Sequence, residues 1–230
     1  VEIHDATLRD GEQTPGVVFS KDDKVRIAEK LLECGVTRIE AGMPAVSGQD
    51  YEAICEIAKR FPQAKIFSFA RATHGDIDMA ADCGATGVVI ETPIGYPKLK
   101  HQFHWTWEKV LEKSADSIRY AKSKGIRVNC KNGVWRAYIS FFEKDVPCEP
   151  KWGNWFASYT EFQTHYAKIA EAEQCDLFIA GCEMVMTEHR SEEWRNVIAA
   201  IRNCYHGLVS YNTDKYQEEN VTWWDCVDLI

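Results

Sequence analysis

Short apolar runs alternate with longer amphipathic segments along almost the whole chain. The short runs have the length of buried strands, and the segments between them carry apolar residues at helical spacing. This alternation predicts parallel strands joined by helices that cover the sheet. We count eight candidate strands, which are VEIHDAT, RIEAG, KIFSFA, GVVIET, IRVNC, DLFIAG, GLVSYN and CVDLI. Eight such units predict an α/β fold, a single (β/α)8 TIM barrel over 1–230, with an open doubly wound sheet as the alternative.

Two long connections, over 92–105 and 131–157, are expected to follow strands of this barrel. Loops at the carboxyl ends of barrel strands carry the chemistry in this fold. Reactive side chains are therefore expected at the strand ends.

Composition excludes several classes of partner. A chain of 230 residues with 45% hydrophobic content can bury one sizeable core, and its net charge of −8 without a basic tract argues against nucleic-acid binding. No apolar run is long enough to span a bilayer, so no membrane partner is expected. Nine cysteines without a Cys-x-x-Cys pair are typical of a reduced, cytoplasmic protein, which we expect to be soluble.

The first candidate strand runs directly into a charged segment, DATLRDGEQTPGVVFS. It brings a cation, Arg9, next to a carboxylate, Asp10, with the amide of Gln13 close behind. Carboxylate oxygens suit hard divalent cations, and a held positive charge can stabilise a developing oxyanion. The segment is therefore typical of a metal-assisted site, although charges on a solvated barrel rim would give the same pattern.

Residues 1–129 resemble the DRE-TIM metallolyase superfamily, which includes isopropylmalate synthase, homocitrate synthase and hydroxymethylglutaryl-CoA lyase. The resemblance rests on DATLRDGEQTPGVVFS, RIEAGMPAVS, the strand FSFAR and the segment SIRYAKSKGIRVN. It implies that Arg9 stabilises an enolate oxygen, that Asp10 ligates a divalent metal and that Gln13 contacts substrate. It also implies that Glu40 and Arg71 line the pocket.

The same resemblance implies a His-x-His pair on a late strand, and the sequence departs from it there. The histidines stand at positions 4, 74, 101, 104, 165, 189 and 206, so no two are separated by a single residue. A carboxylate alone does not hold a divalent ion tightly. We therefore expect no required cofactor, and at most a weakly bound Mg²⁺ or Mn²⁺ at Asp10.

The second part of the chain differs in composition, since six of the eight tryptophans follow position 130. The segments KNGVWRAYI, WFASYTEFQTHYAKIAEAEQCDLFIAGCEMV and SYNTDKYQEENVTWWDCVDLI resemble clan-A glycoside hydrolases of the β-mannanase-related type, which are also (β/α)8 barrels. This resemblance implies that Glu183 is the general acid/base. Trp135, Trp223 and Trp224 are candidates for stacking on sugars, and packing in the core is the alternative for each.

The two resemblances divide the barrel into 1–129, with strands one to five, and 130–230, with strands six to eight. Our leading hypothesis is an engineered chimeric scaffold in which both parental sites are incomplete and neither parental activity is complete. Two alternatives stay open. One is a divalent-metal-dependent acyltransferase or lyase of the DRE-TIM type, and the other is a glycoside hydrolase or sugar-binding barrel.

One feature at the end of the sequence suggests a partner. No helix follows CVDLI in this sequence, so we expect an uncovered apolar groove between the last and first strands. Exposed apolar patches of this kind mark interaction surfaces, and we expect a homodimer through this groove.

Overall fold

The computed structural model describes residues 2–93, 95–133, 151–214 and 216–230, and it divides the chain into two compact units. The N-terminal unit comprises residues 2–92 and 105–131, and the C-terminal unit comprises residues 93–104 and 132–230. The division after Lys131 lies close to the boundary at 129/130 that the two resemblances suggested.

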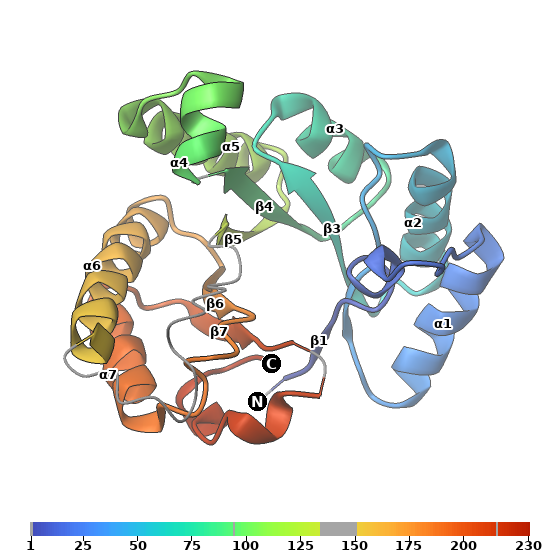
Figure 1. The fold of residues 1–230 in the computed structure, drawn as a ribbon. Helices are drawn as coiled ribbons and strands as arrows, with labels where there is room; N and C mark the ends of the chain where they lie inside the picture. Colours follow the sequence, from blue (N-terminus) through green and yellow to red (C-terminus); the bar gives the residue numbers. More distant parts are fainter. Residues whose placement is uncertain (1, 94, 134–150, 215) are drawn as a thin grey trace. The chain divides into compact units, whose positions relative to one another are not determined.

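Parallel strands form the centre of the N-terminal unit and follow one another in chain order (Figure 1). The first four strands pair in parallel, with His4 opposite Arg38, Ile39 opposite Ile66 and Phe67 opposite Gly87. The strands are β1 (His4–Asp5), β2 (Arg38–Glu40), β3 (Lys65–Arg71), β4 (Gly87–Pro93) and β5 (Arg127–Gly133). This register places the carboxyl ends of neighbouring strands at the same edge of the sheet.

Each long helix of this unit begins at a hydroxyl side chain that accepts a backbone N–H of the first turn. The helices are α1 (Lys21–Glu33), α2 (Gly48–Arg60), α3 (His74–Asp82) and α5 (Trp107–Ser123), with caps at Ser20, Ser47, Thr73 and Thr106. At Ser20 the cap is reciprocal, because the Asp23 carboxylate also accepts the Ser20 N–H. Caps of this kind stabilise a helix by about 1 kcal/mol each.

Aliphatic side chains from the strands and helices of the N-terminal unit make its core. Leu8, Ile39, Ile54, Ile57 and Ile66 are all buried in one cluster. Burial of each such side chain contributes about 1.5–3 kcal/mol, so these residues hold α2 against β2 and β3. Val25 and Ala28 bring α1 into the same cluster.

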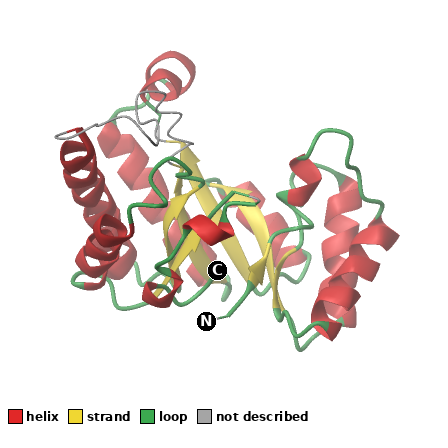
Figure 2. Cartoon of the chain, turned by 60° about the horizontal axis from the view of Figure 1, so that its bottom comes forward, coloured by secondary structure: helices red, strands yellow, loops and turns green. Residues whose placement is uncertain are grey.

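The C-terminal unit contains two long helices and two paired strands. Its elements are the short helix α4 (Tyr96–Lys98), α6 (Lys151–Ala172), β6 (Leu177–Cys182), α7 (Ser191–Arg202) and β7 (Leu208–Asn212). Strand β6 pairs with β7 in parallel, and the register shifts between Ile179 and Cys182. Figure 2 shows the alternation of strands in yellow and helices in red.

Aromatic residues fill the core of the C-terminal unit where the other unit uses aliphatic ones. Trp194 of α7 stacks on Trp223 with ring centroids 4.8 Å apart, and Tyr211 of β7 meets both indoles edge-on. Tyr159 of α6 packs against Trp194 and donates its hydroxyl to the Ala180 carbonyl at 2.7 Å. These contacts fix α6 and α7 against β6 and β7.

Seven of the eight predicted strands form within the described residues. The eighth prediction, a strand over CVDLI, was wrong. Leu229 makes only an isolated parallel bridge to Ser210. The chain runs through two short 3-10 helices, Glu218–Asn220 and Trp224–Cys226, just before this point. The Asp228 carboxylate then accepts the Val209 N–H and a guanidinium N–H of Arg202, which secures the segment near the beginning of β7.

The part of the chain that the structure describes contains no long apolar helix. None of its helices combines the length and the hydropathy needed to cross a bilayer.

Candidate functional sites

The end of β1 and the end of β2 meet in a cluster that we call the arginine cluster, formed by His4, Arg9, Asp10 and Glu40. The Arg9 Nε donates to Glu40 Oε1 at 2.5 Å, and Arg9 Nη1 donates to Asp10 Oδ1 at 2.5 Å. The His4 Nε2 lies 3.8 Å from Glu40 Oε2. The Arg9 guanidinium also lies over the Phe69 ring, 4.8 Å from its centroid. Three predicted residues, Arg9, Asp10 and Glu40, are therefore brought together.

A tight turn after β1 orients the side chains of Arg9 and Asp10. The Ala6 carbonyl accepts the backbone N–H groups of Arg9, Asp10 and Gly11 at 3.1, 2.7 and 3.3 Å. Glu40 is the last residue of β2, which pairs with β1. The side chains thus meet at the carboxyl edge of the sheet, where the sequence placed them.

A buried lysine anchors this turn, and the sequence analysis missed it. The Lys24 side chain is 1% exposed, and its Nζ contacts Glu12 Oε2 at 2.6 Å, Asp50 Oδ1 at 2.6 Å and the Leu8 carbonyl at 3.1 Å. Asp50 also accepts the Met43 N–H, so one ammonium joins the loop after β1 to the loop after β2. In the sequence, Lys24 could have been recognised by its position next to Val25 on the buried side of α1.

Close packing around Asp50 requires a glycine at position 42. Gly42 has a φ of +146°, and a Cβ there would lie 2.9 Å from Asp50 Oδ2. A side chain would therefore clash with the carboxylate that holds Lys24.

The Arg9 guanidinium keeps Glu40 ionised despite its burial. Burial by itself would raise the pKa of Glu40, but the charge of Arg9, the nearby His4 ring and the hydrogen bond from Arg9 outweigh it and lower the pKa to about 2. An opposite charge in contact favours the charged form of an acid. The positive charge of Arg9 is accordingly compensated by two carboxylates.

The donor set of the arginine cluster does not fit a tightly held divalent ion. Asp10 and Glu40 both give an oxygen to Arg9, and the described residues contain no group of three or more His, Cys, Asp or Glu side chains arranged for a metal. Divalent cations require several oxygen ligands together. Asp10 as a metal ligand stays a prediction.

Two other predicted residues occupy different positions. Gln13 is exposed and ends the 3-10 helix Gly11–Gln13 that follows Asp10. Arg71, at the end of β3, makes a bidentate pair with Asp76, with Nε to Oδ2 at 2.8 Å and Nη2 to Oδ1 at 2.9 Å. Arg71 thus fastens β3 to the first turn of α3, and substrate contact by either residue stays a prediction.

In the C-terminal unit, the ends of β6 and β7 form a second cluster, the glutamate cluster, made by Glu183, Glu188, Tyr211, Thr213 and Trp223. Glu183 directly follows β6 and has a φ of +53°, a conformation that non-glycine residues seldom adopt. Its N–H donates to the Asn212 carbonyl at 2.8 Å. The N–H of Met184, the next residue, donates to the Tyr211 hydroxyl at 3.1 Å.

A second acid, Glu188, is fully buried in this cluster, and the sequence analysis missed it. Its Oε1 accepts the Tyr211 hydroxyl at 2.6 Å and the Thr213 hydroxyl at 2.8 Å. Its Oε2 is buried without a hydrogen-bond partner among the described residues. In the sequence, Glu188 could have been recognised as an acid that follows the apolar residues of EMVMTEH, five positions after Glu183.

The surroundings of Glu188 favour its neutral form. Burial raises the pKa of Glu188, and the nearby charges of Asp214 and Glu183 raise it further. The hydrogen bonds from Tyr211 and Thr213 act in the opposite direction without cancelling the rise. A raised pKa favours the protonated form, which is the form that a general acid requires.

The predicted tryptophans have different environments. Trp223 is 0% exposed and donates its indole N–H to the Glu188 carbonyl at 3.0 Å, which favours a packing role over contact with a sugar. Trp224 is half-buried and donates its indole N–H to the Glu218 carbonyl at 3.1 Å. Trp135 lies outside the described residues.

Two protein families match the chain over different stretches. The HMGL-like family matches residues 1–145, and Glycoside Hydrolase Family 113 matches residues 88–230. The homocitrate synthase AksA of Methanopyrus kandleri is 44% identical over 146 residues, which are 63% of this chain and 36% of the relative. The chain thus spans little more than a third of that protein. Both resemblances seen in the sequence are confirmed.

Solved structures from both families share the fold. A GH113 β-1,4-mannanase is 35% identical, with a TM-score of 0.56 over 71% of this chain and 60% of that chain. The hydroxymethylglutaryl-CoA lyase of Bacillus subtilis is 13% identical, with a TM-score of 0.71 over 94% of this chain and 68% of that chain. The predicted α/β barrel fold is confirmed, with seven strands in the described residues. The chain belongs to the HMGL-like family through residues 1–145 and to Glycoside Hydrolase Family 113 through residues 88–230.

Proposed function

We propose that this protein is an engineered chimeric TIM-barrel scaffold, in which an HMGL-like segment and a GH113 segment are joined and neither parental activity is complete. The observation that carries the proposal is the pair of family matches, because each covers one part of the chain and the two overlap only over 88–145. Function resides in sites and not in folds, so a joined barrel can keep the fold while both sites stay partial.

The arginine cluster supports this proposal. Arg9 would have to direct its charge at a substrate oxygen, but Glu40 and Asp10 already accept its N–H groups. The histidine spacing of the sequence also departs from the His-x-His pair that the metallolyase resemblance implies.

The glutamate cluster supports it in a different way. Retaining glycosidases need two carboxyl groups about 5 Å apart, one of which attacks the sugar as an anion. One acid near Glu183 is Glu188, which is buried and hydrogen-bonded to Tyr211 and Thr213. Burial raises the pKa of Glu188, which disfavours the anion that a nucleophile requires.

The proposal is tested by measuring three activities of the folded chain. These are condensation of the homocitrate synthase type and cleavage of hydroxymethylglutaryl-CoA, both with millimolar Mn²⁺ or Mg²⁺, and hydrolysis of β-1,4-mannan. We expect rates no higher than those of Asp10→Ala and Glu183→Gln, with a cooperative thermal transition by circular dichroism. Turnover that either substitution abolishes would overturn the proposal.

A metal-dependent acyltransferase or lyase is the second candidate. It is favoured by the position of Asp10, whose half-exposed carboxylate lies at the carboxyl end of β1 beside Arg9. The test compares the thermal midpoint with and without millimolar Mn²⁺ for the chain, for Asp10→Ala and for Asp22→Ala, an exposed acid of α1. A rise that only Asp10→Ala removes would support this candidate.

A glycoside hydrolase or sugar-binding barrel is the third candidate. It is favoured by the raised pKa of Glu188, caused by burial and by the Asp214 and Glu183 charges, in a cluster that also holds Glu183. Tryptophan fluorescence is titrated with manno-oligosaccharide on the chain and on Glu183→Gln. A saturable change that the substitution weakens would support this candidate, and a flat titration would count against it.

A further inference from the structure

Three strands of the N-terminal unit begin with a cation. Arg38 is the first residue of β2, Lys65 is the first of β3 and Arg127 is the first of β5. The arginine cluster lies at the carboxyl edge of this parallel sheet, so these three cations lie at the opposite, amino edge. They come together in a chain whose net charge is −8.

Arg38 and Lys65 stand directly opposite one another. They are partners in the register of β2 and β3, so their side chains point to the same face of the sheet. One carboxylate oxygen, Glu2 Oε2, faces both of them, 3.8 Å from Arg38 Nη1 and 3.5 Å from Lys65 Nζ. Both distances are longer than a normal hydrogen bond, so two cations share one acid at a loose separation.

Arg127 lies on the same face, beside Gly87 of β4. A Cβ placed on Gly87 would be 3.2 Å from the Arg127 Cβ and 2.7 Å from Phe67 Cδ1. The Phe67 ring therefore occupies the space over Gly87, and the Arg38 guanidinium lies over that ring, 4.8 Å from its centroid. Contacts thus run from the stem of Arg127 across Gly87 and Phe67 to Arg38, which places the three strand ends around one surface.

Positive charge is in excess on this surface. Among the described residues, Lys65 pairs with Glu2 alone and Arg127 makes no ion pair. Like charges that face each other across neighbouring strands destabilise a sheet, and one carboxylate offsets only one of them. The position of Glu2 Oε2 marks a point where an anionic oxygen is accepted between two cations.

We propose that this amino-edge site, formed by Arg38, Lys65 and Arg127, binds a phosphate group in place of the Glu2 carboxylate. A phosphate group has more negative charge than a carboxylate and presents three acceptor oxygens, so it can accept N–H groups from several cations at once. Guanidinium and ammonium groups both recognise phosphate in proteins. Solvent reaches the site, because the Lys65 side chain is 37% exposed and Arg127 is exposed.

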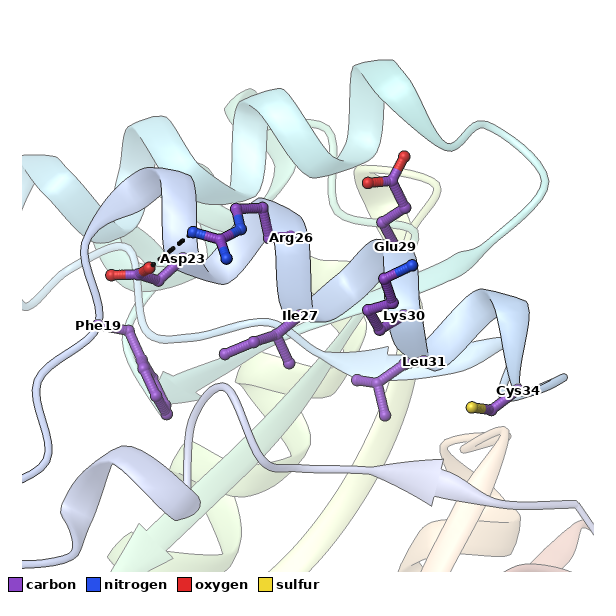
Figure 3. Close-up of a pocket in the computed structure, with 8 residues that line it drawn as sticks. All are labelled: Phe19, Asp23, Arg26, Ile27, Glu29, Lys30, Leu31 and Cys34. Atoms are coloured by element: carbon purple, nitrogen blue, oxygen red, sulfur yellow. Dashed lines mark ion pairs between the residues drawn. The ribbon is translucent and has the colours of Figure 1, made fainter.

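The groove beside α1, with a volume of about 560 Å³, shows how a balanced surface differs from this site. Figure 3 shows Arg26 paired with Asp23, and the distance from Arg26 Nη1 to Asp23 Oδ1 is 3.7 Å. The other base that lines the groove, Lys30, pairs with Glu33 at 2.7 Å. Each base there has an acid of its own, so the groove does not select an anion.

The test is calorimetric titration of the full chain with inorganic phosphate at low ionic strength, because salt screens exposed charges. We expect saturable binding whose dissociation constant rises about three- to tenfold in Lys65→Gln and in Arg127→Gln. Glu2→Gln removes the competing carboxylate and should lower the dissociation constant about threefold. Arg38 is left unchanged, since its side chain is only 4% exposed and its loss would disturb the fold.

Lys59→Gln is the matched control, since it removes an exposed cation of α2 away from the strand ends and should leave the dissociation constant unchanged. Circular dichroism confirms that each variant is folded. Titration with glycerol phosphate separates the two sources of the group: equal affinity identifies the free ion, and tighter binding identifies a phosphate ester.

Three results would overturn the proposal. The first is the absence of saturable binding to the folded chain. The second is an equal loss in Lys59→Gln and Lys65→Gln, because the attraction would then belong to surface charge in general. The third is a Glu2→Gln variant that binds phosphate no more tightly, because the carboxylate would then not occupy the position of the anion.

Discussion

Each of the two units buries a glutamate after or at the end of a strand, but the two environments shift the pKa of that glutamate in opposite directions. Glu40, the last residue of β2, contacts the guanidinium of Arg9 at 2.5 Å, and its pKa is lowered to about 2 although burial acts against this. Glu188, after β6, contacts two hydroxyl groups and no cation in the described part of the chain, and burial raises its pKa.

The difference shows that the residue type alone does not set the chemistry of a strand end. An acid beside a cation stays a fixed charge and fastens its neighbour in place, whereas an acid buried near other acids has a raised pKa. The first arrangement uses the cation that a metallolyase-type site would need. The second disfavours the anionic form of the acid near Glu183.

The largest effect is expected from removing the cation of the first unit. Arg9→Ala leaves Glu40 buried without its counter-charge, and breaking a buried pair in this way costs about 3–5 kcal/mol of unfolding free energy. Urea unfolding followed by circular dichroism measures the loss.

Arg60→Ala is the matched control, because Arg60 pairs with Glu29 at 3.2 Å with both side chains exposed. Exposed pairs contribute less than about 1 kcal/mol, so this variant should stay close to the unchanged chain. Equal losses in the two variants would refute the account of the arginine cluster.

Acid should remove the contribution of Glu40. Its pKa is 4.5 when unperturbed and about 2 in the folded chain, so its stabilisation is complete above about 4.5 and is lost as the pH falls toward 2. The shift corresponds to on the order of 3 kcal/mol at neutral pH. The difference in unfolding free energy between the chain and Glu40→Gln, measured from pH 7 to pH 3, should shrink as the pH falls. A constant difference would contradict the lowered pKa.

The sequence predicted the fold well because buried strands and amphipathic helices leave periodic patterns of their own. It also predicted the meeting of Arg9, Asp10 and Glu40, since these residues end neighbouring strands. It failed where the partners are distant in sequence and the residue looks ordinary. Lys24 is recognised only through Asp50, and Glu188 only through Tyr211 and Thr213.

The strand prediction failed at CVDLI for a related reason. Alternating apolar residues suggested an extended segment, but Trp223 enters the core beside Trp194 and the chain turns at Trp224–Cys226. Burial of an indole therefore decides the backbone path where local periodicity favoured a strand.

A smaller effect is expected from removing the Tyr211 hydroxyl, which hydrogen-bonds to both Met184 and Glu188. Tyr211→Phe removes the acceptor of the Met184 N–H and a donor to Glu188. Leaving such buried groups unpaired costs about 1–3 kcal/mol. Tyr216→Phe, at an 84% exposed position, should cost nothing measurable by urea unfolding. If the two variants are equally stable, the hydroxyl does not hold the loop after β6.

The smallest change in unfolding free energy is expected from Glu188→Gln. Its dependence on pH should have the opposite sign to that of Glu40→Gln. The amide keeps an acceptor oxygen for the Tyr211 and Thr213 hydroxyls and cannot ionise. Because burial and the Asp214 and Glu183 charges raise the pKa of Glu188 in the folded chain, stability falls as the pH rises from its unfolded pKa through its folded pKa. Unfolding free energies from pH 4 to pH 8 should therefore move in favour of Glu188→Gln as the pH rises, whereas Glu40→Gln loses ground over the acidic part of that range. A parallel response of the two variants would contradict a lowered pKa for Glu40 together with a raised pKa for Glu188.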